Sequence, residues 1–499
     1  MDQDLRSIQQ ARDLAIKAKA AADEWATATQ EDVDRAVEAM SMAGRAAAKE
    51  LAELAVKVTG YGRSDHKEIK DLFNVVDLYD AIAPLRTVGV ISAQRETGVV
   101  EIAEPVGVIA ALIPTTNPVS TVFFKGLISI KARNAVVMAP HPRAAGASAA
   151  AAQVLVEALR SVGAPDGLLS CMTEISLDGT HALWNHDAVS MVLATGSAAM
   201  VRAAHSSGKP TYAVGPGNVP SYIHASVTDL HDAAAGTLAS GVFDYGTPCA
   251  SEQSVIVDRA IEHALRDRLE ALGARFLSDD EAERLTKAVF TPSLTFNPDC
   301  VGQSPQALAE RAGITVDPQT TALVVRPEGV GRDHPLSMEL LTSTLKWYVE
   351  SGPDEGIARA NQLLRFGGEG HTAAVWAGDE RVSGRFGVMA RAFRVLVNTP
   401  ACFGAMGATA ALPPSFMLGT GTWGGSITAD NIGPLHLINR KRVAQGIRDW
   451  RELMEVAAGR LPTQPSPLVA STTRDPREVV EDLVHRVLQR LGEPAGTSA

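Results

Sequence analysis

The sequence predicts an α/β fold with a parallel sheet, and one segment carries most of this prediction. Residues 104–118 have the short, β-branched apolar run of a buried strand, followed by a turn with Asn117 between two prolines. Residues 120–130 then favour a helix, and residues 134–138 favour a second short buried strand. Strand, helix and strand at this spacing form a βαβ unit, whose two strands are parallel.

The same order repeats downstream, which indicates a sheet of several parallel strands. An Ala-rich helix is expected at residues 144–162, a strand at 188–194 and a helix at 198–207. Residues 208–218 are rich in Gly and Pro, and we expect a flexible crossover there.

The remaining elements complete the α/β pattern. Residues 4–83 are helical and are expected to cover a sheet, with Thr29 to Asp32 as a capping box. Further elements are expected as strands at 98–104, 254–257, 321–325, 371–376 and 394–398, a charged helical pair at 259–289, and a helix at 380–392.

Size and composition limit the classes of protein that fit. A chain of 499 residues exceeds the length at which single cores stop growing, so two principal domains are expected. The net charge of −11 argues against a nucleic-acid surface. Four widely separated cysteines, no signal peptide and no apolar stretch of membrane length predict a cytoplasmic protein without membrane contact.

A Gly-containing turn, Thr195-Gly196-Ser197, joins the strand at 188–194 to the following helix. Such a turn presents free backbone N–H groups at a helix N-terminus, where a phosphate can bind. An ordinary turn between a strand and a helix explains the same three residues equally well.

Cys249 lies in a turn of small residues that leads into the strand at 254–257. A nucleophilic thiolate needs open backbone and nearby hydrogen-bond donors, and this turn offers both. Taken alone, the window fits a buried structural cysteine better.

The C-terminal part has a separate organisation. Residues 461–474 have the composition of a linker, and residues 475–492 predict an amphipathic helix with Asp475 as N-cap. Its apolar stripe is formed by Val480, Leu483, Val484, Val487, Leu488 and Leu491. A helix this short must dock on its own subunit, on an oligomer interface or on another protein.

Six stretches match a known family in the same order. They are EPVGVIAALIPTTNPVSTVFFKGLISIKARNAVVMAPHPRA, SSGKPTYAVGPGNVP, GTPCASEQSVIVD, HPLSMELL, GGEGHTAAV and LGTGTWGGSITADNIGPLHLINRKRVA. Together they resemble the CoA-acylating branch of the aldehyde dehydrogenase superfamily, from about residue 100 to about residue 445. The resemblance favours a catalytic role for Cys249 over a structural one.

The resemblance implies a domain plan. Residues 1–222 would form a Rossmann-like cofactor domain, with 425–460 returning to it or to an oligomer interface, and residues 223–424 an α/β catalytic domain. A homodimer or homotetramer is expected. Family members with such a terminal helix are often cargo of bacterial microcompartments, so the helix is interpreted as an encapsulation peptide for a shell protein, and the lumen of a microcompartment as a possible location.

The resemblance also assigns residue roles. Cys249 would attack an aldehyde and carry the resulting thioester, and the amide of Asn117 with the backbone N–H of Cys249 would bind the oxyanion. The cofactor phosphates would lie at Thr195, Gly196 and Ser197, with Gly215 and Glu339 as further cofactor-binding residues. The proline that usually follows the family glutamate by four residues is Ser343 here. No metal is expected, and His141, His205, His371 and His436 are given no role.

One difference from the hydrolytic branch predicts the product. Hydrolytic relatives carry a glutamate base in a Glu-Leu-Gly-Gly-Lys stretch, which matches Val214 to Asn218 here. Without that base the thioester would persist until the thiol of CoA arrives. We therefore expect a short-chain aldehyde, CoA and NAD to give an acyl-CoA, with NADP as a possible cofactor. A sulfoacetaldehyde or semialdehyde dehydrogenase and a noncatalytic scaffold are the alternatives.

Overall fold

The fold is described from a computed structural model that covers residues 2–94, 97–446, 449–458 and 482. The predicted linker at 461–474, and the predicted helix at 475–492 apart from Asp482, lie outside the described residues. The chain builds two parallel sheets, with five and seven strands, and a separate antiparallel sheet of three strands. The α/β prediction is confirmed.

The N-terminal half contains the five-stranded sheet. Its order is β5-β4-β3-β6-β7, with strands β3 (Val108–Ile113), β4 (Ala135–Pro140), β5 (Leu169–Cys171), β6 (Val189–Thr195) and β7 (Thr211–Val214). All pairings are parallel. The chain turns from β3 outward to β5 and then returns to β6 on the other side of β3. This reversal is the switch point at which doubly wound sheets bind ligands, at the carboxyl ends of the strands.

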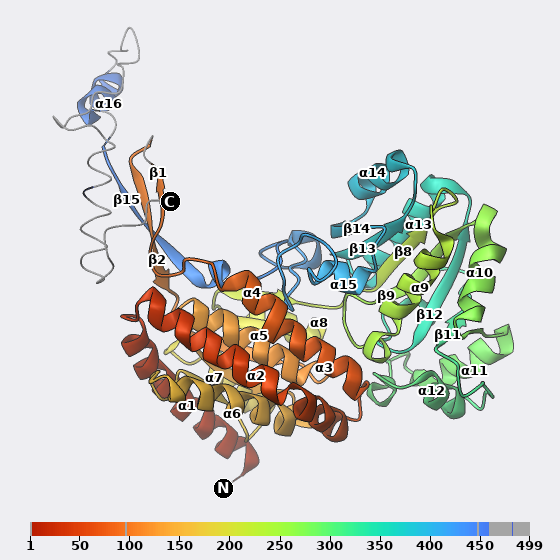
Figure 1. The fold of residues 1–499 in the computed structure, drawn as a ribbon, viewed down its shortest axis with the longest axis horizontal. Coiled ribbons are helices and arrows are strands. Elements are labelled where there is room, and N and C mark those ends of the chain that lie inside the picture. Colours follow the sequence, from red (N-terminus) through yellow and green to blue (C-terminus); the bar gives the residue numbers. More distant parts are fainter. Residues whose placement is uncertain (1, 95–96, 447–448, 459–481, 483–499) are drawn as a thin grey trace.

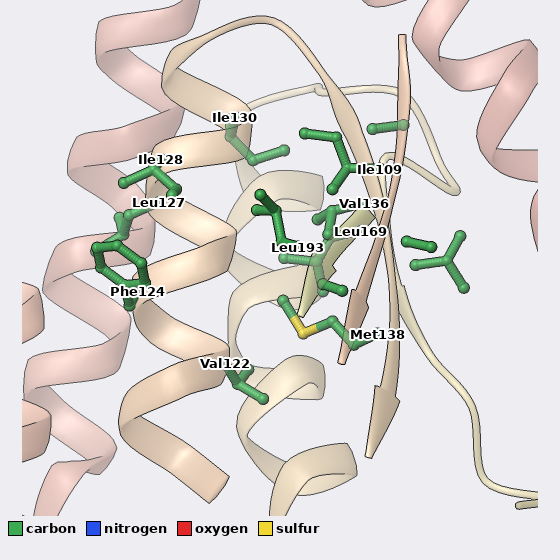
Figure 2. Close-up of a cluster of buried hydrophobic side chains, with 14 of the residues drawn as sticks. Ile109, Val122, Phe124, Leu127, Ile128, Ile130, Val136, Met138, Leu169 and Leu193 are labelled. Atoms are coloured by element: carbon green, nitrogen blue, oxygen red, sulfur yellow. The ribbon is translucent and has the colours of Figure 1, made fainter. Parts of the chain in front are cut away.

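Helices enclose this sheet. They are α1 (Gln3–Trp25), α2 (Gln30–Thr59), α3 (Ser64–Phe73), α4 (Tyr79–Ile82), α5 (Pro118–Lys131), α6 (Ala145–Ser161), α7 (Leu177–Trp184) and α8 (Ala198–His205). Every residue of α5 is buried, because α5 lies between the sheet and α2. Figure 2 shows apolar side chains of α5 together with Ile109, Val136, Leu169 and Leu193, one from each of four strands.

The C-terminal half contains the seven-stranded sheet. Its order is β10-β11-β12-β9-β8-β13-β14, with strands β8 (Val219–Ile223), β9 (Glu252–Asp258), β10 (Ala274–Phe276), β11 (Ala322–Val325), β12 (Thr344–Glu350), β13 (Gly370–Trp376) and β14 (Ala392–Val397). Along β9, Val255 and Val257 join one hydrophobic cluster and Ile256 another. Since side chains alternate along a strand, both faces of this sheet are covered.

The helices that cover the seven-stranded sheet come from the same half of the chain. They are α9 (Leu230–Gly241), α10 (Glu262–Ala271), α11 (Asp279–Val289), α12 (Pro305–Arg311), α13 (Gly352–Gly367), α14 (Glu380–Met389) and α15 (Ala401–Ala405). None of the helices in the described part of the chain is both long and apolar enough to cross a membrane.

The third sheet projects from the body. Strand β2 (Val99–Pro105) pairs with β1 (Gly89–Gln94) on one side and with β15 (Ile438–Ala444) on the other, and both pairings are antiparallel. Figure 1 shows these strands as a long arm, with α16 (Trp450–Ala457) near its far end. Strand β15 therefore pairs with a strand from the N-terminal half of the chain, and the predicted return of residues 425–460 to the cofactor domain or to an oligomer interface stays a prediction.

Most predicted elements are present within a few residues of their expected ends, and the capping box at Thr29 and Asp32 is formed. The expectation of a flexible crossover at 208–218 was wrong, because residues 211–214 form β7 at the edge of the five-stranded sheet. The predicted domain boundaries at residues 222 and 424 stay predictions. Strand β8, at residues 219–223, already belongs to the second sheet.

Candidate functional site

The site lies where the chain passes from the five-stranded sheet to the seven-stranded sheet, and this junction is called the seam. The chain leaves the carboxyl end of β7 at Val214 and enters the amino end of β8 at Val219, so only four residues join the two edges. Cys249 comes just before the amino end of β9, the neighbour of β8. Asn117 follows β3, and Thr195 ends β6, at the carboxyl edge of the first sheet. The topology therefore places Asn117, Thr195 and Cys249 at strand ends next to this seam.

The turn before Cys249 has an unusual backbone. Asp244, Tyr245 and Gly246 all have positive φ, at 51°, 53° and 72°. A non-glycine residue in this conformation costs about 1–2 kcal/mol, so the surrounding contacts must hold the turn in place. A side chain at Gly246 would collide with the backbone of Thr342, which explains the glycine there.

The surroundings of Cys249 favour the neutral thiol over the thiolate. The residue is half-buried, and burial together with the charge of Glu339 raises its pKa to about 12, although the charges of Arg394 and Lys70 act in the opposite direction. Burial disfavours the thiolate because the charged form loses its hydration. Reactivity of this thiol therefore depends on the charges that surround it.

This pKa predicts the pH dependence of alkylation. With a pKa of about 12, labelling of Cys249 by iodoacetamide increases about tenfold per pH unit from pH 7 to pH 9, because only the thiolate reacts. Peptide mass spectrometry of quenched samples gives the rate. The Glu339→Gln variant removes the like charge and labels faster at each pH. A rate that levels off near pH 8, as for an ordinary thiol, would contradict the geometry.

Glu339 lies beside the segment that joins β7 to β8. Its carboxylate accepts hydrogen bonds from the backbone N–H groups of Gly217, at 2.7 Å, and Asn218, at 3.5 Å. Burial raises its pKa, and these two N–H groups partly offset the increase. A side chain at Gly217 would collide with the carbonyl oxygen of Cys249, so the backbones of the two segments are in direct contact.

Asn117 is tied to the site through a lysine. The Nζ of Lys70 donates to Asn117 Oδ1 at 2.5 Å and lies 3.4 Å from the hydroxyl of Thr247, two residues before Cys249. The Nδ2 of Asn117 donates to Thr116 Oγ1 at 3.0 Å. Lys70 also pairs with Asp244, whose pKa burial alone would raise, but which the charges of Lys70 and Lys67 lower to about 2.

The turn at Thr195, Gly196 and Ser197 leads into the N-terminus of α8. It lies beside the switch point, next to β7, where Thr195 pairs with Val214. The buried hydroxyl oxygen of Thr195 has no hydrogen-bond partner in the described structure, and a side chain at Gly215 would meet nothing within 4 Å. An unpaired polar group beside open space at a helix N-terminus is suited to a phosphate-bearing ligand.

Two residues near Cys249 were not predicted. His371, at the start of β13, is buried, its Nδ1 lies 2.9 Å from Thr372 Oγ1, and its Nε2 has no partner among the described residues. Burial, with the charge of Arg394, lowers the pKa of His371 to about 3, so the ring is neutral. Arg394 is also buried and donates to the carbonyl oxygens of Gly419 and Ala429, at 2.5 and 2.9 Å, which fixes the Gly-rich loop.

Within the described residues, no group of three or more His, Cys, Asp or Glu side chains is arranged to hold a metal ion. The gathered groups are a thiol, an amide, a carboxylate and an open turn at a switch point. Such a set on two parallel sheets is typical of the class of α/β enzymes that carry a cysteine at the junction of two parallel sheets.

The comparison with protein families identifies the family within this class. The sequence model of the aldehyde dehydrogenase family matches residues 5–288, which is more than half of the chain. The chain belongs to the aldehyde dehydrogenase family.

Two curated relatives show how the chain compares in length. It is 37% identical over 447 residues to the bifunctional aldehyde-alcohol dehydrogenase AdhE of Escherichia coli (strain K12), covering 88% of this chain and 50% of that protein. It is 35% identical over 442 residues to a sulfoacetaldehyde dehydrogenase (acylating) of Cupriavidus necator, covering 87% and 89%. The chain thus spans about half the length of the AdhE-type relatives it matches and most of the sulfoacetaldehyde dehydrogenase.

Solved structures with the same fold include an acetylating aldehyde dehydrogenase from Geobacillus thermoglucosidasius, at 43% identity and a TM-score of 0.88, covering 90% of this chain and 99% of that one. A Rhodopseudomonas palustris propionaldehyde dehydrogenase with bound CoA and an acylated cysteine matches at 25% identity and 0.78, covering 87% and 97%. A propionaldehyde dehydrogenase from a Clostridium phytofermentans fucose utilisation bacterial microcompartment matches at 25% and 0.78, covering 86% and 96%.

Proposed function

We propose that this protein oxidises a short-chain aldehyde and transfers the acyl group to CoA, with Cys249 as the nucleophile. The observation that carries the proposal is the contact between the backbones of Gly217 and Cys249. It puts Cys249 beside the segment Val214 to Asn218, which by resemblance matches the stretch that carries the base of hydrolytic relatives and begins with a buried valine instead. An apolar side chain cannot activate water. The relatives support the same reaction, because they include an acetylating enzyme and one with bound CoA and an acylated cysteine.

The residues divide the reaction into two halves. The thiol of Cys249 first loses its proton to water, and the thiolate attacks the aldehyde carbon. The oxygen of the adduct is stabilised by the amide of Asn117 and the backbone N–H of Cys249. A dinucleotide held with its phosphates at the Thr195–Ser197 turn and its nicotinamide ribose at Glu339 would accept the hydride that leaves the carbon of the adduct. Cys249 then holds the acyl group as a thioester, and the thiol of CoA attacks its carbonyl carbon and releases the cysteine. The same oxyanion donors serve both halves.

The cofactor residues are assigned on the same basis. Thr195, Gly196 and Ser197 are proposed to bind the phosphates, Gly215 to allow close approach of the backbone, and Glu339 to hold the nicotinamide ribose. The orphaned hydroxyl of Thr195 and the open space at Gly215 support this assignment. NAD is taken as the default cofactor, with NADP as the alternative.

A coupled assay tests the proposal. NADH formation from propionaldehyde is followed with purified protein in the presence and absence of CoA, and the acyl product is identified by mass spectrometry. Sustained turnover is expected only with CoA, and propionyl-CoA is the product. Free acid formed at the full rate without CoA would show that a base activates water at this site.

A sulfonated substrate is the second candidate. It is favoured by the acylating sulfoacetaldehyde dehydrogenase, which matches this chain over 89% of its own length. The comparison of kcat/KM for propionaldehyde with that for sulfoacetaldehyde decides between the two, because a site built for an uncharged chain discriminates strongly against a sulfonate.

We further propose that the protein is a homo-oligomer, either a dimer or a tetramer. The edge strand β14 leaves Phe393 and Val397 40% and 45% exposed on alternate positions, and the three-stranded arm extends away from the body (Figure 1). Exposed apolar edge strands pair with other chains unless they are covered. Light scattering should give a multiple of 52.6 kDa, and a monomer would contradict the proposal.

We propose that the C-terminal tail directs the protein to the lumen of a bacterial microcompartment. The support for this proposal is the apolar stripe of residues 475–492 and the likeness to a dehydrogenase from a bacterial microcompartment. Truncation after Pro462 should abolish association with the shell and preserve turnover. Loss of turnover or of oligomer formation would instead assign the tail a structural role.

A further inference from the structure

A buried lysine contacts both segments that the proposed oxyanion site uses. Lys70, on α3, is 1% exposed, and its ammonium group donates to Asn117 Oδ1 at 2.5 Å and to the carboxylate of Asp244. It also lies 3.4 Å from the hydroxyl of Thr247 in the turn that leads to Cys249. One side chain from the N-terminal helices therefore connects the loop after β3 with the turn before β9.

The lysine determines which way the amide of Asn117 faces. An ammonium group is a donor only, so the atom of Asn117 that contacts it must be the acceptor Oδ1. The NH2 group is then on the opposite branch, where one hydrogen bonds to Thr116 Oγ1 and the other stays available. An amide flip would place NH2 against the ammonium of Lys70, with two donors facing each other. The contact thus fixes the donor side of Asn117 without touching a substrate.

The position of the ammonium is itself fixed. Asp244 is fully buried and accepts from Lys67 Nζ at 2.9 Å, from the hydroxyl of Thr247 at 2.6 Å and from the backbone N–H of Arg63 at 2.7 Å. A side chain at Gly62 would collide with the Asp244 carboxylate, so the connection between α2 and α3 lies directly on it. With the contact from Lys70, four groups therefore hold the Asp244 carboxylate. Neither this carboxylate nor the ammonium group paired with it can reorient without breaking several buried hydrogen bonds.

We propose that Lys70 is a positioning residue for the oxyanion site, which orients the side-chain amide of Asn117 through its contact with Oδ1. This proposal rests on the proposed function, in which Asn117 supplies a donor to the oxyanion. Lys70 does not touch the reacting atoms, and its effect passes through Asn117. Its loss lets the amide rotate, so the donor is misplaced for part of the time.

Lys67 provides a matched control. It lies one helical turn away on α3, is also buried, and pairs with the same carboxylate of Asp244, but its other contact is the carbonyl oxygen of Thr116. Lys70→Met is expected to lower the single-turnover rate of NADH formation at saturating aldehyde about 10- to 100-fold. The upper end of this range approaches the loss in rate that follows removal of one oxyanion donor. Lys67→Met is expected to lower the single-turnover rate less than about threefold, and KM for NAD should change little in either variant. Equal losses in the two variants would overturn the positioning role, because they would show only damage to the shared ion pair.

A double-mutant cycle shows whether Lys70 acts through Asn117. In the Asn117→Ala background, Lys70→Met should cause no further loss, because the group it orients is gone. Losses that multiply would mean that Lys70 acts directly, and would overturn the proposal. If wild type shows no CoA-dependent turnover, the proposed function fails, whereas normal wild-type turnover with multiplying losses contradicts only the positioning role.

Asn117→Asp tests the same contact with Lys70 intact, in case Lys70→Met does not fold. A carboxylate at residue 117 accepts from Lys70 but presents no N–H donor. The variant should therefore be as slow as Asn117→Ala while its thermal midpoint is at least that of wild type. A lower midpoint would show that the oxygen of residue 117 does not face Lys70 in solution.

Discussion

Cys249→Ala is expected to lower CoA-dependent NADH formation by at least about a thousandfold, since removal of a covalent nucleophile eliminates both halves of the proposed reaction. The other groups at the site cannot replace it. Burial and the charge of Arg394 lower the pKa of His371 to about 3, so its imidazole is a weak base and a weak nucleophile, and Glu339 is engaged by two backbone N–H groups. Residual activity should be measured with the same preparation in which the thermal midpoint confirms folding.

Cys171→Ala is the matched control for this variant. Cys171, at the end of β5, is also half-buried, and burial raises its pKa to about 12, as at Cys249. The two thiols thus have similar acidity and differ in their place in the fold. Cys171→Ala should keep nearly all activity. Comparable losses in the two variants would mean that Cys249 contributes packing rather than chemistry, as a noncatalytic scaffold would require.

Gly217→Ala is expected to have the second largest effect, a loss in kcat of about a hundredfold. The added methyl group collides with the carbonyl oxygen of Cys249, and backbone cannot move aside as the end of a flexible side chain can. A shift of the reactive group by about 1 Å is enough for such a loss. The backbone at Gly217 is not in the left-handed region, so the effect is a collision and not conformational strain.

Gly215→Ala separates this collision from a general intolerance of the segment. Gly215 is two residues away, and a side chain there meets nothing within 4 Å. The variant should fold with an unchanged thermal midpoint and keep kcat within about threefold, while KM for NAD increases if the cofactor lies against this backbone. A greater loss of kcat at Gly215 than at Gly217 would contradict the packing described for the seam.

The fold was predictable where the pattern is local. The segment from residue 104 to 138 gave β3, α5 and β4, because β-branched runs and a buried helix are visible in a short window. Strand β12 was missed, since its run includes Lys346, a charged residue that is fully buried because its Nζ donates to Gln253 Oε1 at 2.8 Å. A partner 93 positions away in the chain leaves no trace in a local pattern.

Prediction of the site residues from the sequence was limited in the same way. Cys249, Asn117 and Glu339 were predicted through the motifs that carry the family resemblance, and their roles stay proposals. Lys70 belongs to a charged helical segment that looks like a solvated surface, and its partner Asp244 is 174 residues away. His371 was dismissed because isolated histidines are mostly structural, although it lies close to Gly217 and Arg394 at the seam. Only the three-dimensional arrangement brings these groups together.

The central claim is that Cys249 holds an acyl group until CoA removes it. Protein mixed with NAD and propionaldehyde, without CoA, should accumulate a propionyl group, which peptide mass spectrometry locates on Cys249. Addition of CoA should remove the group as propionyl-CoA within the time of one turnover. No adduct, an adduct on another residue, or a rapid loss of the group in water without CoA would contradict the account.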